Sequence, residues 1–439
     1  MKRLALLLLS CLLALPAWAA GSKPLLLAHV GLIDGTGSPV QKDMTVAIEG
    51  DRIADVYPAG SKPDPKDAQV RDLGGRYVIP GLIDAHVHIT DIEPDMEHYR
   101  LFLRALLLGG VTGVRDMAGD DRLLGYLARE ANSDALASPD IFYAALMAGP
   151  TFFHEDDRVR DASRGVLLGF APWMQAITAG TDLPLAVAEA KGTGATGLKL
   201  YANLPASLVD AITAEAHRQG LRVWTHATIF PARPDDAVEA GADTISHSAY
   251  LVWEAAPHVP DDYGARTRGD FEHVPPDAPA IMALFKAMKR HGTILDATLS
   301  VFKFLAEQRP GSAGRGILPW TYSVTKLAHE QGVLVDAGTD GFALPLKGDD
   351  PDLHALPTVH QEMALLVQHC GFTPVEAIRA ATQVGAMALG QSAQRGTIAP
   401  GKLADLVVLD ADPSRDIRNT AKIEFVVKNG KVYSRAGAQ

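Results

Sequence analysis

The chain has 439 residues, a formal net charge of −11 and 47% hydrophobic residues. The negative charge argues against a nucleic acid or an anionic membrane as partner. The length and apolar content suffice for one large domain with a smaller one, and two cysteines exclude a disulfide-rich scaffold.

The N-terminus has the pattern of a secretory signal peptide. Two basic residues precede an apolar run that ends at Pro16, and residues 17–19 (Ala-Trp-Ala) form a small-x-small cleavage site. An uncleaved anchor would need a longer apolar stretch of about 20 residues. A lipoprotein site at Cys11 is disfavoured because the apolar run continues past it. We expect cleavage after residue 19 and a periplasmic or secreted protein, in which Cys370 is left without a disulfide partner.

Short alternating strands follow the leader, at residues 24–30 and 44–48, with turns between and after them. From residue 81 to 390 the pattern changes to repeated units of a strand, a loop and an amphipathic helix. Strands are predicted at 111–116, 141–149, 196–202, 221–227, 243–248, 292–300 and 333–340, and helices at 208–219, 280–290 and 321–331.

Repeated strand–helix units indicate an α/β fold with a parallel sheet, and eight of them would close a (β/α)8 TIM-like barrel. An open doubly wound sheet is the alternative, but no glycine-rich phosphate motif opens any of these helices. Two irregular loops, 154–173 and 251–279, follow barrel strands and are expected over the active-site face.

The last part of the chain returns to strands. A helix is predicted over 374–389, followed by strands within 396–413 and 422–433. We expect the two strand-rich ends, residues 20–80 and 391–439, to pair with each other as one small β-sandwich beside the barrel.

The first barrel strand ends in GLIDAHVH, residues 81–88. Side chains two residues apart in a strand point to the same side, so His86 and His88 face one space. At the carboxyl end of a barrel strand that space is the catalytic face, where two imidazoles suit a divalent metal. Such a pair is common by chance and needs further ligands nearby.

Further ligand types fall at the ends of later predicted strands, namely His226, His247 and Asp340. Each alone has a simple structural explanation, as a buried histidine or a capping aspartate. Imidazole and carboxylate groups at successive strand ends are what a zinc-type site needs, and their coincidence favours that interpretation.

Lys199 lies in the strand-like run 196–202, where a buried ammonium would be costly. Extension of the side chain into water is the simple alternative. A lysine facing several cations would be driven to its neutral amine, which can add CO2. The resulting carbamate is an anionic ligand with two oxygens that can bridge two metals.

As a set, these motifs resemble those of the metal-dependent amidohydrolase superfamily, the urease-like hydrolases, over nearly all of the mature chain. The order HxH, Lys, His, His, Asp is that of its binuclear members, and the subgroup the chain looks most like is the imidazolonepropionase-like and prolidase-like hydrolases. The resemblance is carried by VIPGLIDAHVHI, GVTGVRDMAG, TGLKLYA, WTHA, SHS, DAGTD and GTIAPGKLADLVVLD.

The resemblance implies two divalent metal ions, with zinc as the default, and a hydroxide between them. The ligands it implies are His86, His88 and Asp340 for one ion, His226 and His247 for the other, and carboxylated Lys199 shared by both. Prolidase-like relatives often carry Tyr or His where this chain has Thr228, which leaves the substrate open. The deaminase branch would want a glutamate within 227–230, and none is present.

Asp340 is the expected proton carrier between the attacking hydroxide and the leaving nitrogen. His154 is a candidate to polarise the carbonyl or to bind a substrate carboxylate, although an exposed loop histidine is the simple alternative. Tyr201 and Tyr250 end strands near ligands and are candidate oxyanion donors, or else core tyrosines. The cations available for an acidic substrate are Arg233, Arg266 and Arg268, and the sequence does not choose among them.

The predicted activity is hydrolysis of an amide or peptide C–N bond in a small molecule, such as an N-acyl amino acid or dipeptide. Lactone or organophosphate ester hydrolysis on the same site stays open. A mononuclear imidazolone hydrolase or deaminase and a non-catalytic scaffold are less favoured, because all six ligands are present. No nucleic acid and no stable membrane insertion after signal cleavage are expected, and the resemblance implies a homo-oligomer.

Overall fold

The computed structural model describes residues 23–90, 95–308, 316–341, 346–347, 350–351 and 355–434. The predicted signal peptide, residues 1–19, lies outside the described residues. Within the described part of the chain, no helix combines the length and the apolar character that a membrane span requires.

Parallel strands form a nearly closed barrel, as the sequence predicts. Its last strand returns to its first, because Val87 pairs with Gly341 and the Asp340 amide donates to the His86 carbonyl at 2.9 Å. The barrel strands are, in order, β6 (Leu82–Val87), β7 (Val111–Asp116), β8 (Asp140–Ala148), β11 (Gly197–Leu200), β12 (Arg222–His226), β13 (Thr244–Ser246), β14 (Ile294–Asp296) and β15 (Val335–Asp336).

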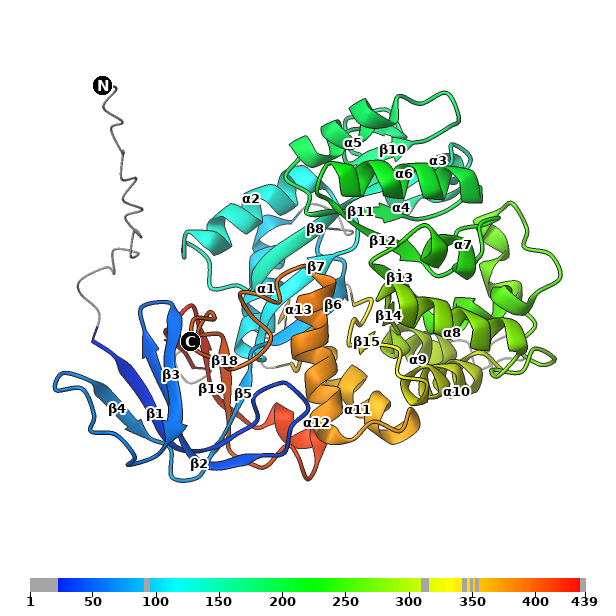
Figure 1. Cartoon of the computed structure of the whole chain (residues 1–439). Helices are drawn as coiled ribbons and strands as arrows, with labels where there is room; N and C mark the ends of the chain where they lie inside the picture. Colours follow the sequence, from blue (N-terminus) through cyan, green and yellow to red (C-terminus); the bar gives the residue numbers. More distant parts are fainter. Residues whose placement is uncertain are drawn as a thin grey trace, which may run out of the picture.

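Helices follow the strands and cover the outside of the barrel (Figure 1). In α8, buried Ile281, Leu284, Phe285 and Met288 recur at helical spacing, and Gly292 ends the helix at a φ of 75°. These outer helices are α1 (Met96–Leu108), α2 (Asp121–Asn132), α5 (Leu183–Gly192), α6 (Ala206–Arg218), α7 (Pro234–Glu239), α8 (Pro279–His291), α9 (Leu299–Gln308), α10 (Ile317–Glu330) and α11 (Val359–His369).

The predicted helix over 374–389 consists of α12 (Pro374–Arg379), a π-helical turn at Ala380–Val384 and α13 (Gly385–Ala388). Thr373 and Glu376 form a reciprocal capping box at its start, which satisfies the first free amide groups.

The two ends of the chain meet in one eight-stranded sheet, with strand order β20-β19-β18-β5-β1-β2-β3 and β4 paired to β1 (Figure 1). Strand β18 from the C-terminal part pairs antiparallel with β5 from the N-terminal part, with Val408 opposite Val78. The predicted boundaries of this domain stay a prediction. Its strands are β1 (Leu25–Leu32), β2 (Gln41–Glu49), β3 (Arg52–Pro58), β4 (Gln69–Asp72), β5 (Tyr77–Pro80), β18 (Leu406–Leu409), β19 (Ile423–Lys428) and β20 (Lys431–Tyr433).

The segments predicted as irregular loops contain short regular elements, so that prediction was wrong in part. Short helices form because local apolar residues can turn onto the barrel rim, as Phe152 and Phe153 do. The elements after β8 are α3 (Phe152–Glu155), α4 (Arg158–Ala162), β9 (Phe170–Ala171) and β10 (Met174–Ala176); those after β13 are 3-10 helices η1 (Ser248–Ala255) and η2 (Tyr263–Arg268). After β15, β16 (Leu346–Lys347) pairs with β17 (Asp350–Pro351), and η4 (Ile417–Ala421) precedes β19.

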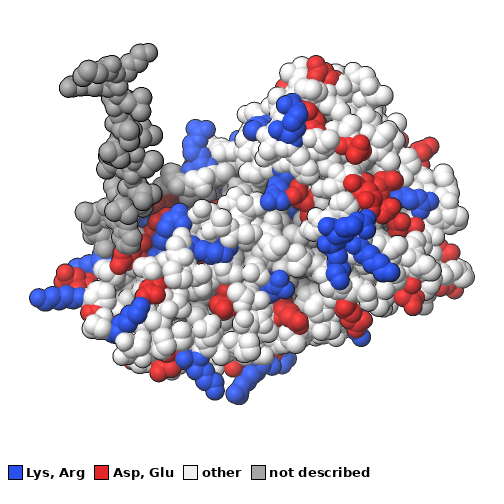
Figure 2. Space-filling view, in the orientation of Figure 1, with Lys and Arg blue, Asp and Glu red and all other residues white. Residues whose placement is uncertain are grey.

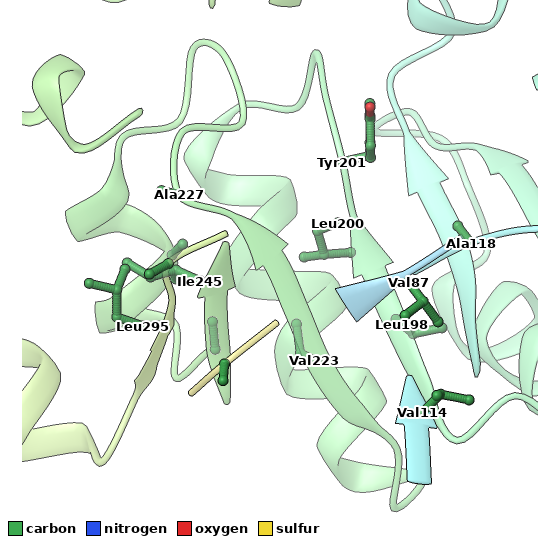
Figure 3. Packing of buried hydrophobic residues seen from close by; sticks show 14 of the residues in the cluster. Val87, Val114, Ala118, Leu198, Leu200, Tyr201, Val223, Ala227, Ile245 and Leu295 are labelled. Carbon is green, nitrogen blue, oxygen red and sulfur yellow. The ribbon is translucent and has the colours of Figure 1, made fainter. Parts of the chain in front are cut away.

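The barrel core is built from apolar side chains of neighbouring strands, among them Val114, Leu198 and Val223 (Figure 3). Strands β6, β7 and β11 are buried along their whole length, as parallel strands covered on both faces must be. Ionisable residues in such strands are therefore exceptional, and Lys199 and Arg115, both 0% exposed, are two of them.

Candidate metal centre

His86, His88 and Asp340 converge at the carboxyl end of the barrel. Each offers a ligand atom, and these atoms lie within 4.8 Å of one another. Nε2 of His88 lies 3.0 Å and Nε2 of His86 lies 3.4 Å from the same Asp340 oxygen. The His86 side chain is 1% exposed, whereas those of His88 and Asp340 are 16% and 21% exposed, so the group opens toward solvent on one side.

The backbone at Asp340 has a left-handed conformation, with a φ of 56°. The turn that leads to it needs Gly338, because a Cβ there would lie 2.2 Å from Oδ1 of Asp296. His247 is also left-handed, with a φ of 77°. Residues other than glycine keep such a backbone only where their surroundings hold it, and they concentrate at functional sites.

His226 and His247 lie beside the first group. Their ring centroids are 4.7 Å apart, and the His247 ring is 5.1 Å from that of His86. Nδ1 of His247 lies 2.9 Å from the Thr298 hydroxyl, which leaves Nε2 as the nitrogen for another ligand. Burial holds the pKa of both histidines well below the usual value, so both imidazoles are neutral, the form that binds a metal.

Lys199 is fully buried beneath these rings. Among the described residues its Nζ has no hydrogen-bond partner, and neither does Nδ1 of buried His226. Burial lowers the pKa of Lys199 to about 7, and its charge acts on both His226 and His86. A buried amine without a partner, set among neutral imidazoles and a carboxylate, fits a metal centre in which the amine carries a CO2-derived carbamate.

Asp296 orients His86 from below, and the sequence analysis missed it. Its carboxylate, at the end of β14, accepts a hydrogen bond from His86 Nδ1 at 2.6 Å and from the Ser246 hydroxyl at 2.8 Å. Arg115 donates to the same carboxylate at 3.2 Å. Burial alone would raise the pKa of Asp296, but the nearby His86 and Arg115 hold it below its usual range. The pattern that would have revealed it is a carboxylate ending an apolar strand.

Asp84, also missed, ties the two ligand-bearing segments together. It accepts from the Thr339 hydroxyl at 2.8 Å, from the Thr339 amide at 3.1 Å and from the His86 amide at 3.2 Å. Burial raises the pKa of Asp84 to about 8. The segment that carries Asp340 is thereby fixed to the strand that carries His86.

Three tyrosines line the other side of the centre. The rings of Tyr201 and Tyr250 lie 4.1 Å and 5.9 Å from that of His226, and Tyr263 stacks on His226 at 5.2 Å with an angle of 21°. Figure 3 shows Tyr201 at the end of β11. Burial raises the pKa of Tyr250 well above its usual value, so its hydroxyl stays a hydrogen-bond donor. Tyr263 was missed because its loop has no strand or helix periodicity.

Within the described residues, neither His154 nor Arg233 forms a hydrogen bond or ring contact with these ligands. His154, in α3, is exposed; its amide donates to the Thr151 carbonyl at 3.1 Å, but within the described residues its ring has no hydrogen bond or ring contact, so its role stays a prediction. Its neighbour Phe152 instead packs against Tyr201, with centroids 4.7 Å apart. Arg233 donates to the Trp253 carbonyl at 2.9 Å and thus stabilises the backbone of that segment.

Comparison with known proteins identifies the family of this chain. The amidohydrolase family matches residues 77–433, most of the chain. The chain therefore belongs to the amidohydrolase family and is an enzyme that hydrolyses carbon–nitrogen bonds.

Its relatives cover nearly the whole molecule. Imidazolonepropionase of Deinococcus radiodurans is 26% identical over 408 residues, covering 86% of this chain and 88% of that protein. A solved Xaa-Pro dipeptidase with bound methionine has a TM-score of 0.74 at 23% identity and covers 94% of this chain and 100% of its own. A solved putative prolidase from Bifidobacterium longum has a TM-score of 0.70 at 26% identity, covering 94% and 95%.

Proposed function

We propose that this amidohydrolase is a binuclear metal-dependent enzyme that cleaves the amide or peptide bond of a small carboxylated substrate, such as an N-acyl amino acid or a dipeptide. The observation that carries the proposal is the amine of Lys199, which is buried near His86, His226, His247 and Asp340 without a hydrogen-bond partner among the described residues. A mononuclear site would have no use for that amine.

The ligand set divides into two groups that share Lys199. His86, His88 and Asp340 would hold one ion, and His226 with His247 the other. The neutral Lys199 amine would add CO2 at its nitrogen and release one proton, and the resulting carbamate would supply an anionic ligand to the metal centre. Two divalent cations, zinc by ligand type, supply a water of lowered pKa and a polarised substrate carbonyl when bound.

The protein's own residues carry the proton and the charge. Asp340 takes a proton from the attacking water and delivers it to the leaving nitrogen. The Tyr250 hydroxyl, protonated because burial raises its pKa, donates toward the oxygen on which negative charge develops. The His86–Asp296 hydrogen bond keeps the first imidazole in the tautomer that presents Nε2.

Amides and peptides are preferred to imidazolones or lactones because of the structural relatives. One of them is a Xaa-Pro dipeptidase, and another is a prolidase complexed with n-methylphosphonate-l-proline at 25% identity. We also propose that the enzyme is exported, which rests on the sequence of residues 1–19 alone. Lys, Arg, Asp and Glu are interspersed on the face seen in Figure 2, which agrees with a small-molecule substrate.

The test is the metal content of the protein prepared with zinc and bicarbonate, beside Lys199→Ala. We expect about two metals per chain in the wild type and one or fewer in the variant, because the shared ligand is lost. Added acetate or propanoate, which can occupy the vacated space, should restore part of the second metal. Lys191→Ala, which removes an exposed lysine, is the matched control.

The same preparations are then assayed with N-acyl amino acids, dipeptides ending in proline or an aromatic residue, lactones, aryl esters and imidazolonepropionate. Turnover of the amides with two metals supports the proposal. One metal in both wild type and Lys199→Ala would make the lysine a bystander, and turnover of esters alone would reject C–N cleavage as the activity.

A further inference from the structure

A cavity of about 260 Å³ opens beside the candidate metal centre, between α3 and η2. Tyr263 belongs to both sites, because it lines the cavity and also stacks on His226. A molecule that fills the cavity therefore contacts the ring that stacks on a candidate metal ligand. No step of the proposed reaction uses the charged residues around this cavity.

Arg266 also lines this space, and its charge contributes to holding the pKa of Asp156 below its usual range. Its guanidinium carbon lies 4.2 Å from the centre of the Tyr263 ring, and the side chain is partly buried. Within the described part of the chain, no carboxylate comes within ion-pair distance of it. Within the same residues, its Nη1 donates one long hydrogen bond of 3.4 Å to the Tyr263 carbonyl. Most of its donors are thus available to a ligand.

The hydroxyl groups next to it are held in a chain of donors. The Tyr201 and Tyr263 oxygens lie 3.2 Å apart, and Nη2 of Arg158 donates to the Tyr201 oxygen at 2.8 Å. Because the Tyr201 oxygen accepts from Arg158, its own hydroxyl hydrogen is available to Tyr263 or to a ligand, and the Tyr263 hydroxyl also contacts that of Tyr250.

The cavity also has carboxylates in its wall, which would favour a cationic ligand if they were free. Two of them are already paired. Asp156 accepts from both Nε and Nη2 of Arg158, at 2.9 and 2.5 Å, and Asp157 lies 2.9 Å from Arg160. Glu155 is exposed, so water solvates it. Among the described residues, Arg266 is thus the cation of this wall that forms no ion pair.

We propose that Arg266, with the hydroxyls of Tyr201 and Tyr263, binds a carboxylate group of the substrate and sets a preference for acidic over neutral amides. The inference rests on the proposed function in treating the bound molecule as a substrate. The binding site itself is inferred from the contacts described above. Arg158 acts as a positioning residue that holds the Tyr201 hydroxyl. A guanidinium and two hydroxyls give a carboxylate charge-assisted hydrogen bonds of the strong kind.

The test is equilibrium binding of two ligands that cannot be hydrolysed, 3-phenylpropanoate and 3-phenylpropan-1-ol, to the zinc-loaded full-length protein. We expect the acid to bind about 10-fold or more tightly than the alcohol. Arg266→Met should remove this preference, and Arg266→Lys should recover part of it because the charge is kept. Arg268→Met, in the same 3-10 helix but exposed, is the matched control and should keep the wild-type preference.

A preference that survives in Arg266→Met, or tighter binding of 3-phenylpropylamine than of the acid, would overturn the inference. Binding does not require turnover, so the two proposals fail separately. A protein that hydrolyses no amide yet shows an Arg266-dependent preference keeps the subsite and loses the function. One that hydrolyses N-acetylphenylalanine and its carboxamide with equal kcat/KM keeps the function and loses the subsite.

Discussion

The guanidinium of Arg115 is fully buried under the candidate metal centre. It donates to the Thr244 hydroxyl at 3.0 Å and to Asp296 at 3.2 Å, and it lies 4.9 Å from the centre of the Trp224 ring. This buried cation helps to hold the pKa of Asp296 below its usual range, which keeps the carboxylate ionised. That carboxylate in turn fixes the His86 ring. The buried series Arg115, Asp296 and His86 therefore determines the orientation of one candidate metal ligand.

Asp296→Asn is expected to weaken zinc binding by about 10- to 100-fold, because the amide cannot balance Arg115 and holds the His86 Nδ1–H less strongly. The affinity is measured by competition with a zinc chelator, at a temperature where circular dichroism shows the variant to be folded.

Ser246→Ala removes one hydrogen bond to the same carboxylate, at 2.8 Å, from a hydroxyl that does not contact His86, and serves as the control with a smaller effect. Equal zinc affinity in wild type and Asp296→Asn would show that the contact with His86 has no influence on the ligand.

At the scale of elements, α9 takes its cap from another helix. Glu362 of α11 accepts hydrogen bonds from the Leu299 amide at 2.8 Å and from the Ser300 amide at 2.7 Å. The side chain is fully buried, and burial raises the pKa of Glu362 to about 7. The start of α9 follows β14 after two residues, so this cap helps to fix the strand end that carries Asp296.

This cap makes stability depend on pH. A carboxyl group whose pKa is raised on folding binds more protons in the folded than in the unfolded protein between pH 4.5 and 7, so stability falls as pH rises through that window. The loss from Glu362 is on the order of 3 kcal/mol at most. Glu362→Gln should remove it.

The check is urea unfolding of the metal-free protein at several pH values from 4.5 to 7.5. The free energy of unfolding of Glu362→Gln should be flatter with pH than that of the wild type. Glu330→Gln, at an exposed position on α10, is the control and should follow the wild type. A Glu362→Gln curve parallel to the wild-type curve would contradict the assigned role.

The sequence predicts the existence of the barrel elements better than the residues at which they begin and end. Helices at 208–219 and 280–290 coincide with α6 and α8, because apolar residues repeat with the helical period. The strand predicted over 292–300 is limited to Ile294–Asp296, and α9 already begins at Leu299. The apolar run continues through the turn, so hydrophobicity alone does not mark where the strand ends.

Some residues of the candidate metal centre are likewise predictable from the sequence and others are not. Residues at strand ends, such as His226 and Asp340, are predictable because a parallel barrel gathers its carboxyl ends on one face. Tyr263 is not, and Arg266 is only one of three candidate cations, since both lie in a loop whose contacts form only on folding. Asp296 ends an apolar strand, which marks it as a candidate, but its partner in β6 is distant in sequence.

At the scale of the whole molecule, a buried cluster of charges joins the barrel to the chain-end sheet. Lys428 of β19 and Arg395 lie 2.9 Å and 2.6 Å from the two oxygens of Asp140, the first residue of β8. Asp405 lies 3.7 Å from Lys428 and 3.5 Å from Arg395. The cluster sits at the amino end of a barrel strand, the side that contributes to stability rather than catalysis.

Lys428→Met should destabilise the protein by about 3 to 5 kcal/mol, because it leaves two buried carboxylates with one cation. Zinc content and activity at low temperature should not change. Urea unfolding gives the free energy, and Lys431→Met is the control: it removes an exposed pair with Asp134 at 2.6 Å, worth about 1 kcal/mol or less. Equal destabilisation by both variants would contradict a special role for the buried cluster.

The pairing of β5 with β18 can form only late in the synthesis of the chain. Strand β5 leads directly into the first barrel strand, but its neighbour on one side is made only after every barrel strand has left the ribosome. A nascent chain that has not reached residue 406 therefore carries a barrel beside an open strand edge. Such an edge pairs with other chains, so an interrupted translation product of this protein would be a seed for aggregation.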